Sequence, residues 1–316
     1  MPSKYTVRAE KITTESSDSK SFIFTPIDND DGLYDYLPGQ FFMVEAKITR
    51  PESIVYDKES KQMIPSGPDV EVVEKKAYSV VSSPTQKGHI ELMIKSEQGV
   101  FAPYLLDQFH EGDTCTLVGP TGKFMKEIFE QNSKFIACWS AGSGIPSTLS
   151  LMQYCLDNQL DTKVVAFDSN KTRDDIIYHD KIKEMVSKSE HFKAVFTATR
   201  QPLDQLPKST SDVIYESGRF WTDENSLAKH TDNRGFFDKL LGKKSNWLEY
   251  FNTICGSSSF INGKGRDKAG KMAKLGEGVE DHLLKFECTP SNIDKDQYYL
   301  QSVSYTHLTL PTILLV

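Results

Sequence analysis

The apolar residues of the first 130 positions fall into short, β-rich segments. These segments read KYTVRAEKI, SKSFIFTP, GQFFMVEAKI, KAYSVVSS, HIELMIKS and TCTLVGP, and turns with Gly and Pro separate them. Short strands with such turns predict an antiparallel barrel or sandwich. Only residues 102–110 show a helical pattern. Residues 49–74 are polar and contain three prolines, and they are expected to form an inserted loop.

From residue 133 the pattern changes to apolar strands that alternate with helices. The pairs are KFIACW before TLSLMQYCLDN, TKVVAFDS before DDIIYHDKIKEMV, and YFNTICG before RDKAGKMAKL, with the strand FKAVFTAT before a loop. Alternation of this kind predicts parallel βαβ units, which bind ligands at the carboxyl ends of their strands. The loops after Trp139, Ser169 and Cys255 are therefore expected to share one functional edge.

Composition narrows the possible functions. The length of 316 residues predicts about two domains. A formal charge of −7 argues against a general binder of nucleic acid, which needs clustered Lys and Arg. The five cysteines are widely spaced, so no metal site is expected, and a reduced, cytoplasmic setting is favoured. The N-terminal segment lacks the apolar core of a signal peptide. Gly and Pro interrupt the uncharged run at residues 135–156, so no transmembrane segment is expected.

One segment between a predicted strand and a predicted helix has a phosphate-binding pattern. It reads AGSGIPSTLSLM, and its small residues allow backbone N–H groups to approach a phosphate at the start of a helix. An ordinary turn between strand and helix is the alternative. The candidate residues are Gly142, Ser143, Gly144, Ile145 and Pro146.

Ordered landmarks over both halves resemble the ferredoxin–NADP reductase family. They are KKAYSVVSSP, ELMIKSEQGVFAPYLLDQ, LVGPTGKF, GSGIP, VAFDSNKTRDDIIYHDKI, the GRF of SGRFWTDE, and ICGSSSFI. The resemblance implies a β + α/β fold, in which an N-terminal antiparallel flavin-binding β-barrel precedes a Rossmann-like parallel-sheet nucleotide-binding domain. The implied parts are a barrel at 1–130, a nucleotide domain at 131–290 with a basic insertion at 229–249, and a tail at 291–316. From about residue 304 the tail looks like vector read-through.

The resemblance also implies an FAD site on the barrel. In the family an Arg-x-Tyr-Ser or Thr pattern places the Arg at the flavin pyrophosphate, the Tyr on the isoalloxazine ring and the hydroxyl near flavin N5. Here Lys76 stands where the family commonly has Arg, and a lysine offers a point charge instead of a bidentate fork. The implied flavin residues are Lys76, Ala77, Tyr78 and Ser79 on a strand, Lys95, and the backbone amides of Gly99, Val100, Phe101 and Ala102. An ordinary strand aromatic at Tyr78 and a solvated Lys95 are the alternatives.

The second implied site holds NAD(P)H. Ser169, Lys171 and Arg173 follow Asp168 where relatives read the adenosine ribose or its 2′-phosphate. A serine with cations suits a phosphate, whereas an acidic residue such as Asp168 at the end of a strand suits a free ribose hydroxyl, so NAD and NADP both remain open. A solvated helix start is the alternative for these residues. Cys255 and Gly256 end the strand that, in the family, approaches the nicotinamide. The catalytic candidates are therefore Ser79 and Cys255, although a free cysteine is also a common core residue.

The resulting interpretation is a flavin-dependent oxidoreductase. Hydride passes between NAD(P)H and FAD, and single electrons pass to or from a protein acceptor, such as a ferredoxin, or a partner subunit. A nucleotide-binding regulatory or assembly module that kept the fold without redox turnover is the alternative. Two roles are open for the insertion at 229–249: packing on its own domain, or docking to an acidic electron-transfer protein or a membrane surface.

Overall fold

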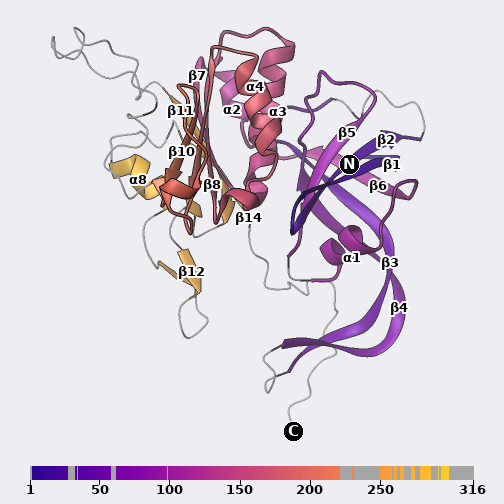
Figure 1. Ribbon diagram of the computed structural model, residues 1–316. Coiled ribbons are helices and arrows are strands. Elements are labelled where there is room, and N and C mark those ends of the chain that lie inside the picture. The colour runs from indigo at the N-terminus through magenta and orange to yellow at the C-terminus, as the bar shows by residue number, and fades with distance from the viewer. Residues whose placement is uncertain are drawn as a thin grey trace, which may run out of the picture.

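The structure is a computed structural model, and it describes residues 2–27, 33, 35–57, 62–97, 99–220, 230, 250–257, 260–261, 264–266, 272–274, 278–285, 291 and 293–298. Two six-stranded sheets lie side by side, one from each half of the chain (Figure 1). The first sheet is antiparallel and the second is parallel. The predicted fold class is therefore confirmed.

The antiparallel sheet has the strand order β4-β3-β6-β1-β2-β5. Its elements are β1 (Ser3–Ser16), β2 (Ser19–Pro26), β3 (Phe41–Asp57), β4 (Gln62–Ser79), β5 (Ile90–Lys95), α1 (Phe101–Asp107) and β6 (Thr114–Thr121). Alternate residues of β1 are buried, as a half-buried strand requires, and they include Tyr5, Val7 and Ala9. Val80 forms an antiparallel bridge to Leu92, which brings the end of β4 back to β5.

The prediction of an inserted loop at residues 49–74 is wrong. Thr49 to Asp57 continue β3 and Gln62 to Glu74 belong to β4, and the two strands pair as a long hairpin that extends from the barrel (Figure 1). Proline removes a ladder donor, so it is confined to strands with a free edge or to bulges. This hairpin provides both, because β3 pairs with β6 only up to Glu45 and a register shift follows Pro51.

The parallel sheet has the order β10-β9-β8-β7-β11-β14. Its elements are α2 (Lys126–Glu130), β7 (Phe135–Ala141), η2 (Gly142–Gly144), α3 (Ile145–Asp157), β8 (Lys163–Asn170), η3 (Arg173–Asp175), α4 (His179–Ser187), β9 (Phe192–Ala198), η4 (Leu203–Gln205), β10 (Val213–Ser217), β11 (Phe251–Ser257), β12 (Lys264–Arg266), β13 (Met272–Lys274), α8 (Val279–Lys285) and β14 (Ile293–Tyr298). After β7 the chain first adds β8, β9 and β10 on one side of this strand, and then β11 and β14 on its other side. At such a switch point the connections diverge and leave room for a ligand at the carboxyl ends of the strands.

The two faces of the parallel sheet bury different clusters. On one face Cys138, Ala166 and Ala194 pack with α3 and α4, and the cluster extends to Val81 and Met93 of the barrel. On the other face Trp139 and Phe167 stack with ring centroids 3.9 Å apart, and α8 joins that cluster. Figure 1 shows α3 and α4 between the sheet and the barrel, with α8 on the far side.

Two secondary-structure predictions near the C-terminus are wrong. The helix expected within RDKAGKMAKL is replaced by β12 and β13, which pair antiparallel through Gly265 and Ala273. Residues 293–298, expected in the tail, form β14, which pairs in parallel with β11. The basic insertion at 229–249, apart from His230, and residues 299–316 lie outside the described residues.

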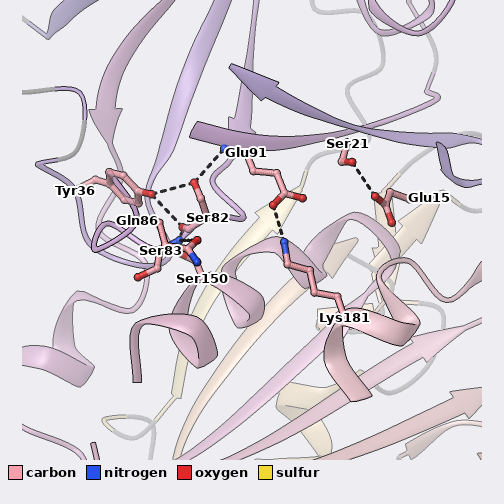
Figure 2. A network of polar contacts seen from close by, with 9 residues as sticks. All are labelled: Glu15, Ser21, Tyr36, Ser82, Ser83, Gln86, Glu91, Ser150 and Lys181. Carbon is pink, nitrogen blue, oxygen red and sulfur yellow. Dashed lines mark hydrogen bonds and ion pairs between the residues drawn. The ribbon is translucent and has the colours of Figure 1, made fainter. Parts of the chain in front are cut away.

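A polar network joins the two sheets (Figure 2). The Ser150 hydroxyl of α3 donates to the carbonyl oxygen of Ser82 at 2.7 Å, and the Tyr36 hydroxyl donates to the same oxygen at 3.0 Å. Lys181 of α4 pairs with Glu91 of β5 at 2.6 Å. These contacts and the shared apolar cluster hold the barrel against α3 and α4.

Candidate flavin and nucleotide site

The end of β4 carries the first candidate residues. Lys76, Ala77, Tyr78 and Ser79 pair with β3 in continuous register, and Ser79 lies opposite Phe41. Ala77 is exposed, whereas Tyr78 and Ser79 are buried. The Lys76 ammonium pairs with the Glu97 carboxylate at 2.5 Å. Lys76 is thus a charged group at the predicted phosphate position, and a carboxylate of the same domain already neutralises it.

The Tyr78 hydroxyl provides a test of whether this surface fits a flavin. It is buried and has no hydrogen-bond partner among the described residues. Burial, and then the nearby Glu97 charge, raise the pKa of Tyr78, so the group stays a neutral hydroxyl. A buried donor without an acceptor costs about 1–3 kcal/mol, and an oxygen of a bound ligand would remove that cost. The residues therefore fit FAD at this strand.

Gly99 shapes the segment that follows Glu97. Its φ is +121°, a conformation that favours glycine, and no atom lies within 4 Å of an added Cβ. Val100 is the N-cap of α1, and no side chain among the described residues bonds to this cap. Phe101 and Ala102 are buried in the barrel core. Open space at Gly99 allows a ligand to approach the backbone there.

Lys95 lies at the boundary between the two domains. Its ammonium pairs with Asp18, in the turn between β1 and β2, at 2.6 Å. Its Cε lies 3.9 Å from the point where a Cβ on Gly142 would stand. Lys95 therefore lies beside the nucleotide loop of the second domain, and it does not join Lys76 and Glu97.

The segment after β7 has the geometry of a nucleotide loop. Gly142 has φ +54°, Gly142–Gly144 form the single turn η2, and α3 starts at Ile145 with Pro146 in its first turn. Proline suits this place because its missing N–H would have had no helical partner. Gly142 and Ser143 are half-buried, so the start of the turn is accessible.

Gly144 packs directly on the end of β11. A Cβ there would lie 2.2 Å from the carbonyl oxygen of Cys255, so any side chain would push the loop away from the strand. Gly256 is equally close-packed, since its added Cβ would lie 2.8 Å from the Phe260 ring. Cys255 itself is buried in the apolar cluster that contains Val81, two residues after Ser79. The structure thus brings the end of the flavin strand, the glycine loop and Cys255 to one region.

The end of β8 carries the other nucleotide candidates. Ser169 is buried, whereas Lys171 and Arg173 are exposed. Arg200 lies next to them, because its backbone N–H donates to the carbonyl oxygen of Lys171 at 2.8 Å. Sequence reasoning missed Arg200, whose place is set only by the pairing of β8 with β9.

Asp168 is buried at the end of β8, and it does not face the solvent as a ribose ligand would. The Ser140 hydroxyl donates to one carboxylate oxygen at 2.8 Å, and the Asn170 amide donates to the other at 2.6 Å. Burial raises the pKa of this carboxyl to about 6, against the effect of these two bonds. The alternative that Asp168 binds a free ribose hydroxyl loses support from this burial.

The described residues contain neither a membrane-spanning helix nor a cluster of metal ligands. No helix there is long and apolar enough to cross a membrane. No group of three or more His, Cys, Asp or Glu side chains in the described ranges is placed to hold a metal ion.

Family models agree with the two halves of the fold. Residues 68–125 match the oxidoreductase FAD-binding domain, and residues 135–263 match the oxidoreductase NAD-binding domain. The chain belongs to the ferredoxin–NADP reductase-like family of FAD- and NAD-binding oxidoreductases. The two models describe an oxidoreductase FAD-binding domain and an oxidoreductase NAD-binding domain, so the cofactors of this chain are FAD and a nicotinamide nucleotide.

Individual members of the family are distant in sequence. The chain is 27% identical over 210 residues to an NADH-cytochrome b5 reductase 2 of Mycosarcoma maydis, with 66% of this chain and 56% of that protein covered. It is 24% identical over 253 residues to a Bacillus subtilis flavohemoprotein, with 79% and 52% covered. The chain thus spans about half the length of the curated relatives that it matches.

A solved structure shows the same fold. The cytochrome b5 reductase domain of Ulva prolifera nitrate reductase aligns with a TM-score of 0.63 at 15% identity, covering 93% of this chain and 97% of that chain. At this identity the likeness establishes the arrangement of the two domains, whereas the roles of single residues rest on their contacts.

Proposed function

We propose that the protein transfers hydride between NAD(P)H and FAD, and exchanges single electrons with a protein acceptor. The observation that carries this proposal is the packing of Gly144 on the carbonyl of Cys255, whose side chain belongs to the buried cluster that also includes Val81, two residues after the end of β4. A nicotinamide on the glycine loop would therefore lie toward the flavin strand. Bound FAD supplies the conversion of a two-electron hydride into single electrons.

The chain's own residues have positioning roles in this proposal. The Tyr78 hydroxyl is a neutral donor in need of an acceptor, and it orients the ligand on β4. Ser79 holds the edge of the ring that faces the second domain. The buried Cys255 forms the wall of the nicotinamide pocket, and the apolar cluster around it excludes water. Orientation of two reactants in a dry site accounts for much of the rate of such reactions.

We propose that the electron acceptor is a haem protein of the cytochrome b5 kind and not a ferredoxin. Support comes from the Mycosarcoma maydis relative, which is named for cytochrome b5. The earlier expectation of a ferredoxin rests on the family resemblance alone. A cytoplasmic setting remains part of the proposal, and it is supported by the buried thiols of Cys115, Cys138, Cys155 and Cys255.

Anaerobic assays with NADH or NADPH as donor test the acceptor. Cytochrome b5, ferredoxin and ferricyanide are compared at two salt concentrations. We expect rapid reduction of ferricyanide, and of cytochrome b5 in a salt-dependent way, since encounter between charged proteins is screened by salt. Faster reduction of ferredoxin than of cytochrome b5 would overturn the choice of acceptor.

A regulatory or assembly module remains the second candidate, because carboxylates already neutralise both candidate flavin cations. Lys76 pairs with Glu97 and Lys95 pairs with Asp18. A module of this kind would bind nicotinamide nucleotide without redox turnover. Nucleotide binding by a protein that stays colourless in excess FAD would favour this candidate over the reductase.

A further inference from the structure

The carboxylate of Asp168 connects the ends of three neighbouring strands. The Ser140 hydroxyl donates to it from the end of β7, directly before the glycine loop. The Asn170 amide donates to it at the end of β8. The backbone carbonyl of Asn170 in turn accepts bonds from the Thr199 N–H at 2.9 Å and the Thr199 hydroxyl at 3.1 Å, beyond the end of β9.

These strand ends carry both segments that would hold a nucleotide. Ser140 lies two residues before Gly142, and Asn170 directly precedes Lys171. Asp168, Ser140 and Asn170 are all buried, so none of them is placed to contact the ligand. Asp168 is therefore able to act on nucleotide binding only through the loops that its bonds hold.

The charged side chain that acts on Asp168 comes from the other domain. Lys95 of β5 acts on the Asp168 carboxyl, and it is itself paired with Asp18 at 2.6 Å. Lys171, on the chain that continues from Asn170, acts on Asp18. Asp168, Lys95, Asp18 and Lys171 thus form a chain of alternating negative and positive charges, and Lys95 in this chain lies beside Gly142.

We propose that Asp168 is a positioning residue, which sets the distance between the glycine loop and the Lys171–Arg173 segment and so determines nucleotide affinity. This inference rests on the proposed function, because it concerns the same nucleotide site. A buried carboxylate is a costly way to hold two loops, and its cost is explained if a fixed spacing is needed for binding.

Loss of the carboxylate is the first test. Asp168→Ala removes both bonds, and we expect the dissociation constants of NAD⁺ and NADP⁺, titrated calorimetrically into the FAD-loaded protein, to rise roughly tenfold. The rate of flavin reduction at saturating nucleotide should change less than about twofold, since Asp168 does not touch the reacting atoms. Asp168→Asn keeps one acceptor oxygen, and its affinity should lie between those of the wild type and the alanine variant.

A double-mutant cycle separates positioning from general destabilisation. Asn170→Ala breaks the same connection, so the Asp168→Ala/Asn170→Ala pair should bind nucleotide no more weakly than either single variant. Glu15→Gln is the matched control. Glu15 is a half-buried carboxylate whose pKa burial also raises, and Ser21 donates to it at 2.7 Å, but it lies on β1. This control should leave nucleotide affinity unchanged.

The pH dependence of the nucleotide dissociation constant distinguishes a positioning role of Asp168 from a purely structural one. Because the pKa of the Asp168 carboxyl is about 6, the wild-type dissociation constant should rise as pH falls through 6 and approach that of Asp168→Asn, which should be flat there. The free energy of unfolding should change in the opposite direction. Because the pKa of Asp168 is raised on folding, its ionised form destabilises the folded protein above pH 6. The melting temperature of Asp168→Asn should therefore exceed that of the wild type at pH 8 and equal it near pH 4.

The outcomes are distinct from those of the proposed function. If neither NADH nor NADPH reduces the wild-type flavin, the proposed function fails. If the wild type is reduced normally while Asp168→Ala binds both nucleotides with wild-type affinity, the positioning role is overturned. Additive losses in the Asp168→Ala/Asn170→Ala pair would overturn it too.

Discussion

The proposed flavin and nucleotide sites of this protein offer different kinds of groups to a phosphate. On the flavin side the charged group is a side chain, Lys76, and Glu97 already pairs with it at 2.5 Å. On the nucleotide side the close approach is made by backbone, since Gly144 leaves no room for a Cβ beside Cys255. Ion pairs rearrange at small cost, whereas close-packed backbone does not. Changes on the flavin side should therefore tune affinity, whereas a side chain at Gly144 should slow flavin reduction itself.

The largest effect is expected from Gly144→Ala. The new methyl group would meet the Cys255 carbonyl oxygen at 2.2 Å, so the loop must move off β11. A displacement of about 1 Å at a reacting centre costs about a hundredfold in rate, so stopped-flow reduction of the flavin by NAD(P)H should slow by about that factor. FAD content should stay normal, which shows that the barrel has folded.

The control for the glycine loop is Ser143→Ala, one position earlier. Ser143 is half-buried, and its side chain can be shortened without a clash. This variant should reduce its flavin within about threefold of the wild-type rate. Wild-type reduction by Gly144→Ala would show that the loop does not position the nicotinamide.

The next effect concerns Lys76 and Glu97. Lys76→Ala should weaken FAD binding roughly ten- to a hundredfold by removing one charged hydrogen bond. Glu97→Gln should tighten FAD binding by up to about tenfold, because it frees Lys76 from its present partner. Lys76→Arg should also tighten binding, because it restores a bidentate donor. Fluorescence titration of apoprotein with FAD measures all three, and weaker binding by Glu97→Gln would remove Lys76 from the phosphate site.

The smallest effect belongs to the contact between the domains. Lys181→Met would leave the Glu91 side chain, which is 10% exposed, without its cation. The cost should be about 1–3 kcal/mol in urea unfolding, with flavin reduction little changed. Lys188→Met breaks the exposed pair with Glu184 and should leave the urea unfolding midpoint almost unchanged. Equal losses in the two variants would show that burial of Glu91 adds nothing.

Residue patterns predicted the fold better than they predicted the contacts of the site. Alternation identified SKSFIFTP, which is β2 from Ser19 to Pro26, and alternation of strand and helix identified the parallel sheet. The hairpin at 49–74 was missed because its prolines lie on strands with free edges, which the sequence alone does not reveal. Strand β14, IDKDQY, was missed because an edge strand needs no apolar pattern.

The pairing of charges at the site was beyond the sequence for a different reason. Glu97, which follows β5, meets Lys76 of β4, and Asp18 meets Lys95 from a turn 77 positions away. The buried bonds of Asp168 depend on the register of β7 with β8, which places Ser140 opposite Asp168. No local pattern encodes such contacts, so the residue types were predictable while their partners were not.

The central claim is tested most directly by one spectrum recorded in two steps. The purified protein is loaded with FAD, freed of excess, and mixed anaerobically with NADH or NADPH while the visible flavin band is followed. The account predicts a yellow protein whose band bleaches within the mixing experiment with at least one of the two nucleotides. A protein that remains colourless after FAD loading, or whose bound flavin stays oxidised with both nucleotides, would contradict it.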